Sequence, residues 1–241
     1  MASEMKVSVI IPAYNEEKSI AKTLRSLEKQ DYKDKWEVIV VDNNSTDKTS
    51  EVSKKFSNNL DLKVILEKKK GRGTARATGA NKSQGEFIFY TDADALVPKN
   101  WISGMVRHFD DSEVVAVTGP WKITDLGGFA QWFLNNFQEV AVLPYTVIRG
   151  MHWLTGFHMA IRRDAYVKCG GFDPELNMHE DIDISERLVK YGKIAYARAV
   201  IVETSGRRYN KGLIRGLLDY ELPGIKFFLF GNKKIVLDDQ R

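Results

Sequence analysis

The sequence predicts an α/β fold with a mostly parallel central sheet that is flanked by helices. Two observations on the 241 residues favour it: short apolar runs rich in β-branched residues recur along the chain, and between them apolar residues recur at helical spacing. Strands that are separated by helices form βαβ units, in which the strands run parallel. Ligands of such sheets bind beyond the carboxyl ends of the strands, so we expect the functional site at that edge.

The first half of the chain supplies most of the predicted elements. Its apolar runs predict strands at residues 7–11, 37–41, 62–66, 87–90 and 114–118. Helices are predicted from the spacing of Ile20, Leu24 and Leu27, from Val52 and Phe56 behind a helix cap at Thr46, and for the ranges 74–83 and 101–109. From residue 121 to residue 160 the sequence is rich in aromatic residues and poor in charge, and its pattern assigns no element clearly.

Charge and composition argue against several classes of protein. A formal net charge of +4 with dispersed basic residues does not favour nucleic-acid binding. The single cysteine, Cys169, excludes an internal disulfide and is typical of a reducing compartment. The apolar run at residues 7–13 is too short for a signal peptide, and no run reaches the roughly 20 apolar residues of a membrane span. We therefore expect a cytoplasmic chain that is soluble or peripheral at the cytoplasmic face of a membrane.

Two carboxylates separated by one residue, Asp92 and Asp94, follow the predicted strand at 87–90. Carboxylate oxygens in this position can hold Mg²⁺ or Mn²⁺, and the metal can bridge the phosphates of a substrate. An aspartate pair at a strand end can also shape a turn. Of the two interpretations the motif by itself favours the metal, although short motifs often match by chance.

Polar residues also follow the first two predicted strands. Asp42 ends the second strand, where its carboxylate can accept a hydrogen bond from the N–H of a nucleobase. The alternative role is a turn or a helix cap, which residues 44–46 suit better than Asp42 does. The segment after the first strand either walls the same cleft or is a loop that a proline begins; it consists of Pro12, Ala13, Tyr14, Asn15 and Glu16.

A basic, glycine-bearing stretch spans residues 68–76. It is not the dinucleotide fingerprint, which needs a third glycine where Arg76 stands, and it is not a Walker A loop, which needs Gly-Lys-Ser/Thr. Its cationic side chains can still meet a diphosphate, although the three lysines also suit a solvated surface. These side chains are Lys68, Lys69, Lys70, Arg72 and Arg76.

An acidic cluster lies at the start of a helix pattern in the second half of the chain. It comprises Glu180, Asp181, Asp183 and Glu186, and it is interleaved with Ile182, Ile184 and Leu188, which suit a core. A carboxylate at the start of a helix and beside a cleft is a candidate general base. Negative charge also stabilises a helix N-terminus, and this structural role is compatible with the functional one.

Together these motifs resemble the family 2 glycosyltransferases. The family has the GT-A fold, with a mostly parallel, Rossmann-like central sheet flanked by helices and a smaller acceptor-binding half. The resemblance extends from Val7 to about Arg208, and its motifs occur in the order of the family. It is carried by residues 12–16, 40–47 and 71–79, by Asp92-Ala93-Asp94, and by Gly170-Gly171-Phe172 followed by Glu180-Asp181.

The resemblance implies an inverting glycosyltransferase, which moves a sugar from a nucleoside-diphosphate-sugar to a hydroxyl of a carbohydrate or lipid-linked acceptor. By this resemblance Asp42 binds the base of the donor and Asp92 lies near the ribose. Asp94, assisted by Asp92, holds Mn²⁺ or Mg²⁺ on the diphosphate. Asp181 deprotonates the acceptor, with Glu180 as the alternative base.

The resemblance also divides the chain into a nucleotide-sugar-binding half (residues 1–97), an acceptor-binding and catalytic half (98–205) and a basic amphipathic tail (206–241). The expected donor-binding residues are Pro12, Ala13, Tyr14, Asn15, Glu16, Asp42, Arg76, Asp92, Ala93, Arg207 and Arg208, and the expected acceptor-binding residues are Trp153, Gly156, Gly171 and Phe172. Many relatives place a histidine ligand shortly after the acidic cluster. Residues 202–208 contain none, which leaves His158 and His179 as nearby alternatives.

The sequence disfavours two other functions. A sugar-phosphate nucleotidyltransferase needs a glycine-rich loop with a basic residue after the first strand, where this chain has Ala13-Tyr14-Asn15-Glu16. A non-catalytic nucleotide-sugar-binding module has no need of the carboxylates Asp92, Asp94 and Asp181. Both alternatives are therefore disfavoured.

Aromatic and basic segments predict peripheral contact with a membrane and an amphiphilic acceptor. The first segment has no charged residue from 127 to 138. Its aromatic stripe contains Phe129, Trp132, Phe133 and Phe137, followed by Tyr145, Ile148 and Trp153. This stripe suits packing against the core and binding of an acceptor equally well. The second segment lies near the end of the chain, where apolar and basic residues alternate. The apolar residues are Leu213, Leu217, Leu218, Phe227, Phe228 and Phe230, and the basic residues are Lys211, Arg215, Lys226, Lys233 and Lys234.

Overall fold

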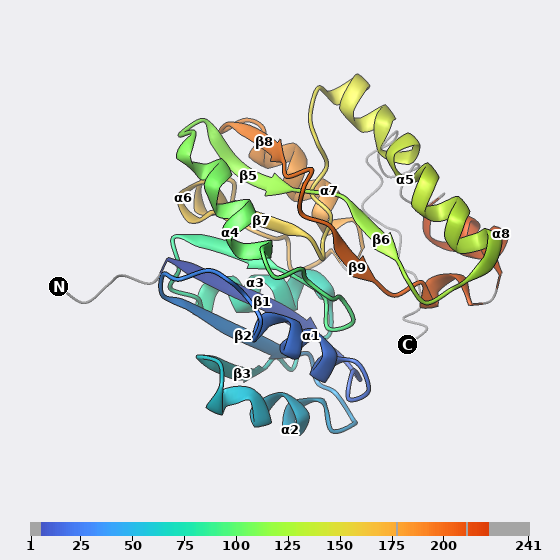
Figure 1. Ribbon diagram of the computed structural model, residues 1–241. Coiled ribbons are helices and arrows are strands. Elements are labelled where there is room, and N and C mark those ends of the chain that lie inside the picture. The colour runs from blue at the N-terminus through green and yellow to red at the C-terminus, as the bar shows by residue number, and fades with distance from the viewer. Residues whose placement is uncertain (1–5, 177, 211, 222–241) are drawn as a thin grey trace.

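The five predicted strands all lie in one sheet. A computed structural model describes residues 6–176, 178–210 and 212–221, and its central sheet has seven strands in the order β3-β2-β1-β4-β7-β5-β8 (Figure 1). The strands are β1 Val7–Ala13, β2 Trp36–Asp42, β3 Leu62–Leu66, β4 Phe87–Tyr90, β5 Val114–Thr118, β7 Met159–Arg162 and β8 Lys193–Tyr196. Strand β7 runs antiparallel to its neighbours β4 and β5, and the other pairs are parallel. The predicted α/β fold with a mostly parallel sheet is confirmed.

Helices cover both faces of the sheet, and each layer buries its apolar stripe against the strands. Helices α1 Ile20–Leu27, α2 Thr49–Lys54 and α4 Trp101–Val106 pack on one face, and helices α3 Arg72–Lys82, α6 Arg163–Lys168 and α7 Glu180–Leu188 pack on the other. In α1 the predicted positions Ile20, Leu24 and Leu27 are fully buried. Two 3₁₀ segments, η1 Lys55–Asn58 and η2 Arg107–Asp110, continue α2 and α4.

Most of the unassigned stretch at 121–160 forms structure beside the central sheet. Strand β6 Trp121–Ile123 pairs in parallel with β9 Val202–Thr204, and the long helix α5 Gly128–Arg149 follows β6. Figure 1 shows α5 projecting at the right of the sheet, next to α8 Leu213–Gly216. A small separate core of Ile123, Leu134 and Tyr209 joins these segments.

The chain ends, as far as the structure describes it, in three short turns. They are η3 Arg207–Tyr209, α8 and the π-helical segment η4 Leu217–Glu221. The predicted apolar residues Phe227, Phe228 and Phe230 lie outside the described residues, as do Lys211, Lys226, Lys233 and Lys234. Within the described part of the chain, no helix is both long and apolar enough to cross a membrane.

Two predicted helix starts differ from the structure. Helix α2 begins at Thr49, with Lys48 at the N-cap position, rather than after a cap at Thr46, and Asp47 Oδ1 accepts a hydrogen bond from Thr49 N at 3.0 Å. Thr46 N donates instead to Asn15 Oδ1 at 2.8 Å. Helix α3 begins two residues before the predicted start, at Arg72, where Gly73 N donates to Leu176 O at 3.2 Å.

The order of the strands creates a crevice at the carboxyl edge of the sheet. Strand β1 lies between β2 and β4, so the chain winds in opposite directions on the two sides of β1, and ligands of such sheets bind at this switch point. The register places Ala13 at the end of β1 beside Asp42 at the end of β2. On the other side of β1, Ile10 pairs with Tyr90, so Asp92 and Asp94 follow at the same edge.

Candidate active site

The loops after β1 and β2 interlock at the carboxyl edge. Asn15 and Asn44 both adopt left-handed backbone conformations, with φ of 55° and 64°. Asn15 N donates to Ser45 Oγ at 3.0 Å, and Asn15 Oδ1 accepts from Thr46 N at 2.8 Å. These contacts fix the segment 12–16, which the sequence analysis placed on the donor side, against the loop that follows Asp42.

Asp42 is buried, with 5% of its surface exposed. Its Oδ1 accepts from Ser45 N at 2.9 Å, and its Oδ2 accepts from the hydroxyl of Ser50. Asp42 itself therefore stabilises the turn, a role that the sequence analysis gave to residues 44–46. Binding of a nucleobase by Asp42 stays a prediction.

Asn43 organises the basic stretch, and the sequence analysis did not single it out. Its Nδ2 donates to Lys69 O at 2.7 Å and to Glu67 O at 3.2 Å, and its Oδ1 accepts from Gly71 N at 2.8 Å. These bonds hold its backbone against the loop after β2. Lys70 lies over the ring of Tyr14 at 4.5 Å and donates to its hydroxyl at 2.8 Å, which places one cation at the edge of the cleft.

The acidic pair after β4 lies in a strongly charged cluster. Arg207 Nη2 lies 3.0 Å from Asp94 Oδ2 and 2.5 Å from Glu16 Oε1, so it joins the segment after β9 to the loop after β1. Burial and the neighbouring charge of Asp92 raise the pKa of Asp94, and Arg207 opposes this shift. Burial by itself lowers the pKa of Arg207, but the hydrogen bond to Glu16 and the charge of Asp94 outweigh it and raise this pKa. Arg207 therefore supplies positive charge to both Asp94 and Glu16.

A cleft of about 520 Å³ opens beside this cluster. Its walls carry more carboxylates than cations; they are formed by Asn15, Glu16, Glu17, Lys18, Ser19, Lys22, Thr46, Asp47, Asp94, Leu96, Thr124, Asp125, Glu203, Thr204, Ser205 and Arg207. The backbones of Leu96 and Glu203 exchange hydrogen bonds of 2.8 and 2.9 Å, which brings the two sides of the cleft together. The two halves of the chain thus meet next to Asp94.

The carboxylates of Asp92 and Asp94 are suitable ligands for Mn²⁺ or Mg²⁺ whose other ligands come from a substrate. Among the residues that the structure describes, no group of three or more His, Cys, Asp or Glu side chains is arranged to hold a metal. Magnesium is usually bound by one or two carboxylates and completes its shell with water and substrate phosphates. Asp94, which lines the cleft, and Asp92, which lies close to Asp94 at the carboxyl edge, can supply those carboxylates.

Helix α7 places the second acidic cluster at the same edge. His179 caps it in a left-handed conformation, with φ of 58°, and Glu180 and Asp181 are its first two residues. Glu180 is 3% exposed and forms an ion pair with Arg76, whereas Asp181 is only partly buried. Asp181 Oδ1 accepts from Ile182 N at 2.9 Å and Oδ2 from Gly156 N at 3.2 Å. The structure thus distinguishes Glu180, whose charge is balanced by Arg76, from Asp181, which is partly exposed.

Arg76 lies between the two acidic clusters. It is 2% exposed, its Nη2 lies 3.0 Å from Asp92 Oδ1, and its Nη1 pairs with Glu180. The predicted contact of Arg76 with a diphosphate stays a prediction, and in the structure two carboxylates already engage the guanidinium. Ala93 is buried between the aspartates, and its carbonyl accepts from Thr23 Oγ1 at 2.9 Å.

The expected acceptor residues fall into two groups. Trp153 and Gly156 lie in the loop between α5 and β7, and Gly156 contacts Asp181 directly. Gly171 and Phe172 are buried, and the Phe172 ring, which is 3% exposed, packs edge-on against Tyr90 at 5.2 Å. This geometry argues against an acceptor contact by Phe172, because its side chain belongs to the core beneath the site.

The remaining candidates lie at the margins of the site. His158 is fully buried, and burial lowers its pKa to about 3, so it offers no accessible nitrogen to a metal. His179 is partly buried at the start of α7, and Arg208 is exposed beside Arg207. The roles predicted for His179 and Arg208 are not decided by their positions.

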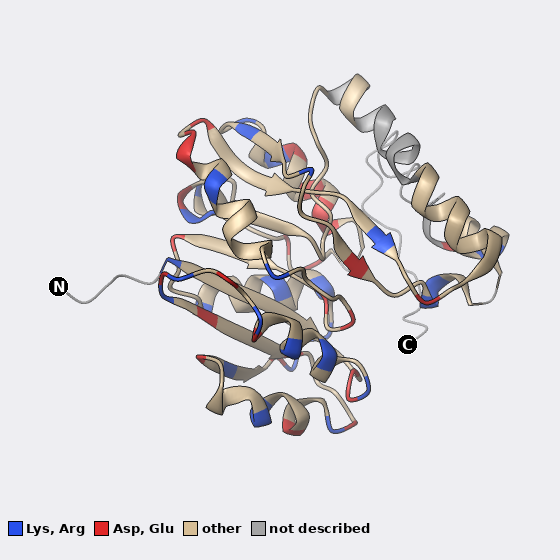
Figure 2. Cartoon of the chain, in the orientation of Figure 1, with Lys and Arg blue, Asp and Glu red and all other residues tan. Residues whose placement is uncertain are grey.

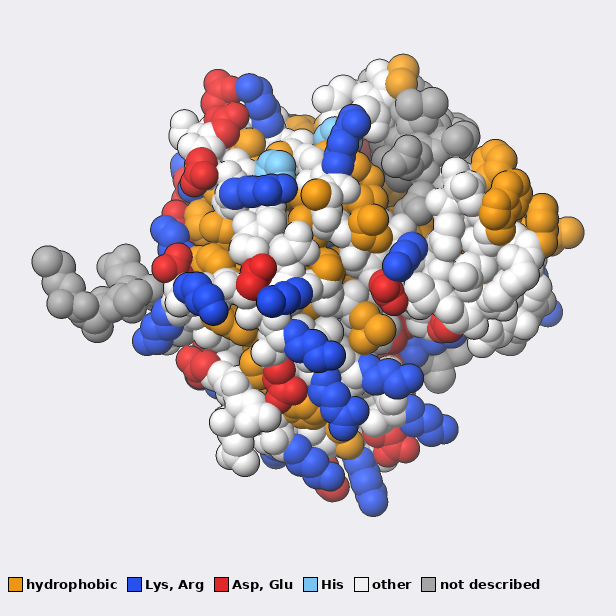
Figure 3. Space-filling model, in the orientation of Figure 1, with side chains coloured by type: hydrophobic (Ala, Val, Ile, Leu, Met, Phe, Trp, Pro, Cys, Tyr) orange, Lys and Arg blue, Asp and Glu red, His pale blue; other side chains and the backbone are white. Residues whose placement is uncertain are grey.

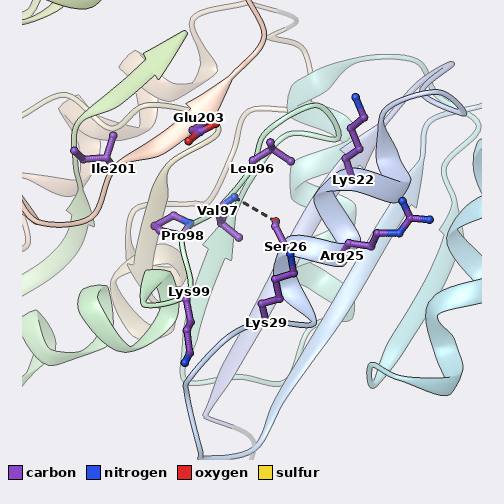
Figure 4. Close-up of a pocket in the computed structure, with 10 residues that line it drawn as sticks. All are labelled: Lys22, Arg25, Ser26, Lys29, Leu96, Val97, Pro98, Lys99, Ile201 and Glu203. Atoms are coloured by element: carbon purple, nitrogen blue, oxygen red, sulfur yellow. Dashed lines mark hydrogen bonds between the residues drawn. The ribbon is translucent and has the colours of Figure 1, made fainter. Parts of the chain in front are cut away.

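A second hollow, of about 390 Å³, lies between α1 and the segment before α4. Figure 4 shows that its cationic side chains diverge: Lys22 and Arg25 point away from Lys99. Figure 2 shows basic and acidic residues interspersed over the molecule. The hollow therefore has the character of a solvated charged surface, and the reaction site is better sought at the cleft beside Asp94.

Comparison with known proteins points to one family. Residues 8–170 match the model of "Glycosyl transferase family 2". A probable glycosyltransferase, YdaM, of Bacillus subtilis is 31% identical over 202 residues, 78% of this chain and 47% of that protein. The poly(ribitol-phosphate) β-N-acetylglucosaminyltransferase TarS of Staphylococcus aureus is 32% identical over 181 residues, 73% of this chain and 31% of TarS. The β-monoglucosyldiacylglycerol synthase of Nostoc is 32% identical over 200 residues, 76% of this chain and 41% of the synthase.

Solved structures agree with the sequence comparisons. The mannosyltransferase PcManGT of Pyrobaculum calidifontis, in complex with GDP-Man and Mn²⁺, superposes with a TM-score of 0.69 and 25% identity, over 85% of this chain and 58% of that one. The chain spans less than half the length of the three relatives that match it in sequence.

Proposed function

Because the chain belongs to glycosyl transferase family 2, whose members are nucleotide-sugar-dependent glycosyltransferases, we propose that it transfers a sugar with inversion from a nucleoside-diphosphate-sugar to an acceptor hydroxyl. One observation carries the proposal. Arg76 joins Asp92, which lies close to the cleft residue Asp94, to Glu180, whose neighbour Asp181 is partly exposed. A single buried side chain therefore brings the expected donor site and the expected base together.

On the donor side, the loops after β1, β2 and β4 receive the nucleotide. Asp42 meets the base, and Asp92 lies near the ribose. Asp94, assisted by Asp92, holds Mn²⁺ or Mg²⁺, which neutralises charge on the departing diphosphate when it is bound. Mn²⁺ accompanies the nucleotide sugar in the mannosyltransferase of Pyrobaculum calidifontis, which supports this assignment. Arg207, next to Asp94, adds positive charge beside the leaving group.

On the acceptor side, Asp181 takes the proton from the attacking hydroxyl. Its carboxylate is partly exposed, and its two hydrogen bonds, from Ile182 N and Gly156 N, still leave lone pairs on both oxygens for the substrate. Glu180 is a weaker candidate, because it is buried and its charge is balanced by Arg76. Protonation of Glu180 would remove one of the negative charges that balance Arg76 in a buried site, which costs free energy.

The acceptor is proposed to be amphiphilic, and the enzyme to work at a membrane surface. Three aromatic side chains of α5 are exposed, Phe129 by 69%, Trp132 by 55% and Phe137 by 43%, so core packing does not account for them. Figure 3 shows hydrophobic side chains protruding at the right of the molecule, where Figure 1 places α5. Nearby, Ile214 and Leu218 are also exposed, beside the cation Arg215. Aromatic side chains flanked by cations suit the lipid interface.

The proposal is tested with a panel of UDP-, GDP- and dTDP-sugars in the presence of Mn²⁺. We expect one donor to be hydrolysed or transferred, with release of the nucleoside diphosphate, and we expect excess EDTA to stop the reaction. Full activity in EDTA would contradict the metal assignment. Binding of a nucleoside diphosphate without any turnover would favour a non-catalytic binding module, and pyrophosphate-dependent formation of a nucleoside triphosphate would favour a nucleotidyltransferase.

A further inference from the structure

Arg76 has a contact set that differs from that of a phosphate-binding arginine. Its guanidinium is almost fully buried and meets three acceptors: Asp92 Oδ1 at 3.0 Å, Gly156 O at 3.1 Å and the carboxylate of Glu180. The guanidinium carbon also lies 5.9 Å from the centre of the Phe172 ring. An arginine that is enclosed in this way holds other residues in place, because the protein engages three of its N–H groups and its Nε is buried away from a ligand.

Gly156 carries the connection from Arg76 to the expected base. Its carbonyl accepts from Arg76, and its N–H donates to Asp181 Oδ2 at 3.2 Å. A Cβ atom at this position would lie 2.8 Å from Arg76 Nη2, so a larger residue would have to displace the guanidinium. The same loop is anchored on α7, since Leu154 N donates to Ser185 Oγ at 3.0 Å. The position of Asp181 therefore depends on a loop that Arg76 holds.

We propose that Arg76 is a positioning residue, which sets the orientation of Asp92 and of Asp181 together and so aligns the donor with the base. This inference rests on the proposed function and deepens it. It differs from a direct contact between Arg76 and the diphosphate in what it predicts. Loss of a direct charged contact would weaken donor binding, whereas loss of alignment lowers the rate of a bound donor.

The test compares Arg76→Met with the double variant Arg76→Met/Glu180→Gln. The single variant leaves Glu180 as a buried carboxylate without its cation, which is expected to destabilise the fold. The double variant removes that charge as well, so it should regain stability. Arg163→Met is the control, because this arginine is partly buried and its guanidinium donates to Gly85 O and Ser83 Oγ, away from the site.

In the double variant we expect kcat to fall about 100-fold, since misalignment near the reacting atoms costs rates of this order. The affinity for UDP, GDP or dTDP with Mn²⁺, whichever the wild type binds, should change less than about tenfold, the smallest loss expected for a charge-assisted contact. Arg163→Met should alter neither quantity. A larger loss of nucleotide affinity, with kcat maintained for the bound donor, would overturn the proposal and assign Arg76 to the diphosphate.

Amide hydrogen exchange measures whether Arg76 holds the loop in place, and it does not require turnover. We expect faster exchange for peptides covering residues 150–158 and the start of α7 in the double variant, while peptides from β1 and β2 keep their protection. Unchanged exchange in the loop would overturn the proposal. If the wild type binds no nucleotide and turns over no donor, the proposed function fails, and the exchange result still decides whether Arg76 holds the loop.

Discussion

Asp181→Asn separates the role of the base from the stability of the fold. Asp181 accepts hydrogen bonds from Gly156 N at 3.2 Å and from Ile182 N at 2.9 Å, one on each oxygen. Asparagine has a single acceptor oxygen, so one of the two bonds is lost and an amide group faces an N–H. The cost in folding free energy is about 1–2 kcal/mol. For a chain of this length, each kcal/mol lowers Tm by about 2–4 °C, so the variant should stay folded.

The effect on catalysis is expected to be much larger. Removing a general base lowers kcat about 10²–10⁴-fold. Each factor of ten corresponds to about 1.4 kcal/mol, so the barrier rises by about 2.7–5.4 kcal/mol. Nucleotide affinity should be nearly unchanged, because Asp181 is assigned to the acceptor. The assay is single-turnover transfer at saturating donor with Mn²⁺, together with calorimetric titration of the nucleoside diphosphate.

Two neighbouring substitutions serve as controls. Asp183→Asn changes an aspartate of the same helix that pairs with Arg187 at 2.5 Å, and it should leave kcat within about twofold of wild type, as expected for a residue outside the chemistry. Glu180→Gln should cost about 3 kcal/mol of stability, because it breaks a buried ion pair. An active Asp181→Asn together with a folded but inactive Glu180→Gln would refute the reasoning and move the base by one residue.

Three further predictions address the metal, the core and the surface. Asp94→Asn should abolish transfer and the dependence of nucleotide affinity on Mn²⁺, without changing Tm by more than a few degrees; Mn²⁺-dependent binding in this variant would count against Asp94 as ligand. Glu37 is fully buried, and despite burial its hydrogen bonds, the largest from Lys63, lower its pKa below the ordinary value of 4.5. Its contribution to the free energy of unfolding is therefore present above pH 4.5 and is lost as pH falls through the lowered pKa of the folded state. The free energy of unfolding in urea should fall over this pH range for the wild type and should not fall in this way for Glu37→Gln. Trp132→Ser should weaken sedimentation with anionic vesicles, whereas Val167→Ser, at an exposed apolar position on α6, should not; equal binding by both variants would argue against α5 as the contact.

The central strands could be predicted because their apolar runs satisfy a local requirement. Strands β1, β2 and β4 are buried on both faces, and so, apart from Ser8, Glu37 and the terminal Asp42, their sequences consist of apolar, largely β-branched or aromatic residues. Helix α5 could not be assigned, because a helix with exposed aromatic residues lacks the usual alternation of apolar and polar faces. The start of α2 was misplaced because several residues near Thr46 can cap a helix, whereas in the structure Lys48 holds the N-cap position and Thr46 N bonds to Asn15 instead.

The positions of the candidate carboxylates could be predicted from the sequence, whereas the contacts that connect them could not. Asp92, Asp94 and Asp181 follow from strand ends and a helix start, which are local features. The role of Gly156 depends on Arg76, which lies 80 residues away in the chain, and the ion pair between Arg76 and Glu180 spans 104 residues. Sequence spacing carries no information on contacts of this range, so it could not separate Glu180 from Asp181. Asn43 was missed for the same reason, since its partners are backbone groups of another loop.

The central claim, inverting transfer from a nucleotide sugar, is tested most directly by proton NMR of the first product formed. The wild-type chain is incubated with Mn²⁺ and the donor that it turns over, and the anomeric coupling of the transferred sugar is recorded before mutarotation. Direct displacement assisted by Asp181 predicts a product whose anomeric configuration is opposite to that of the donor. A product that retains the donor configuration, or the absence of turnover with every donor and acceptor tried, would contradict the account.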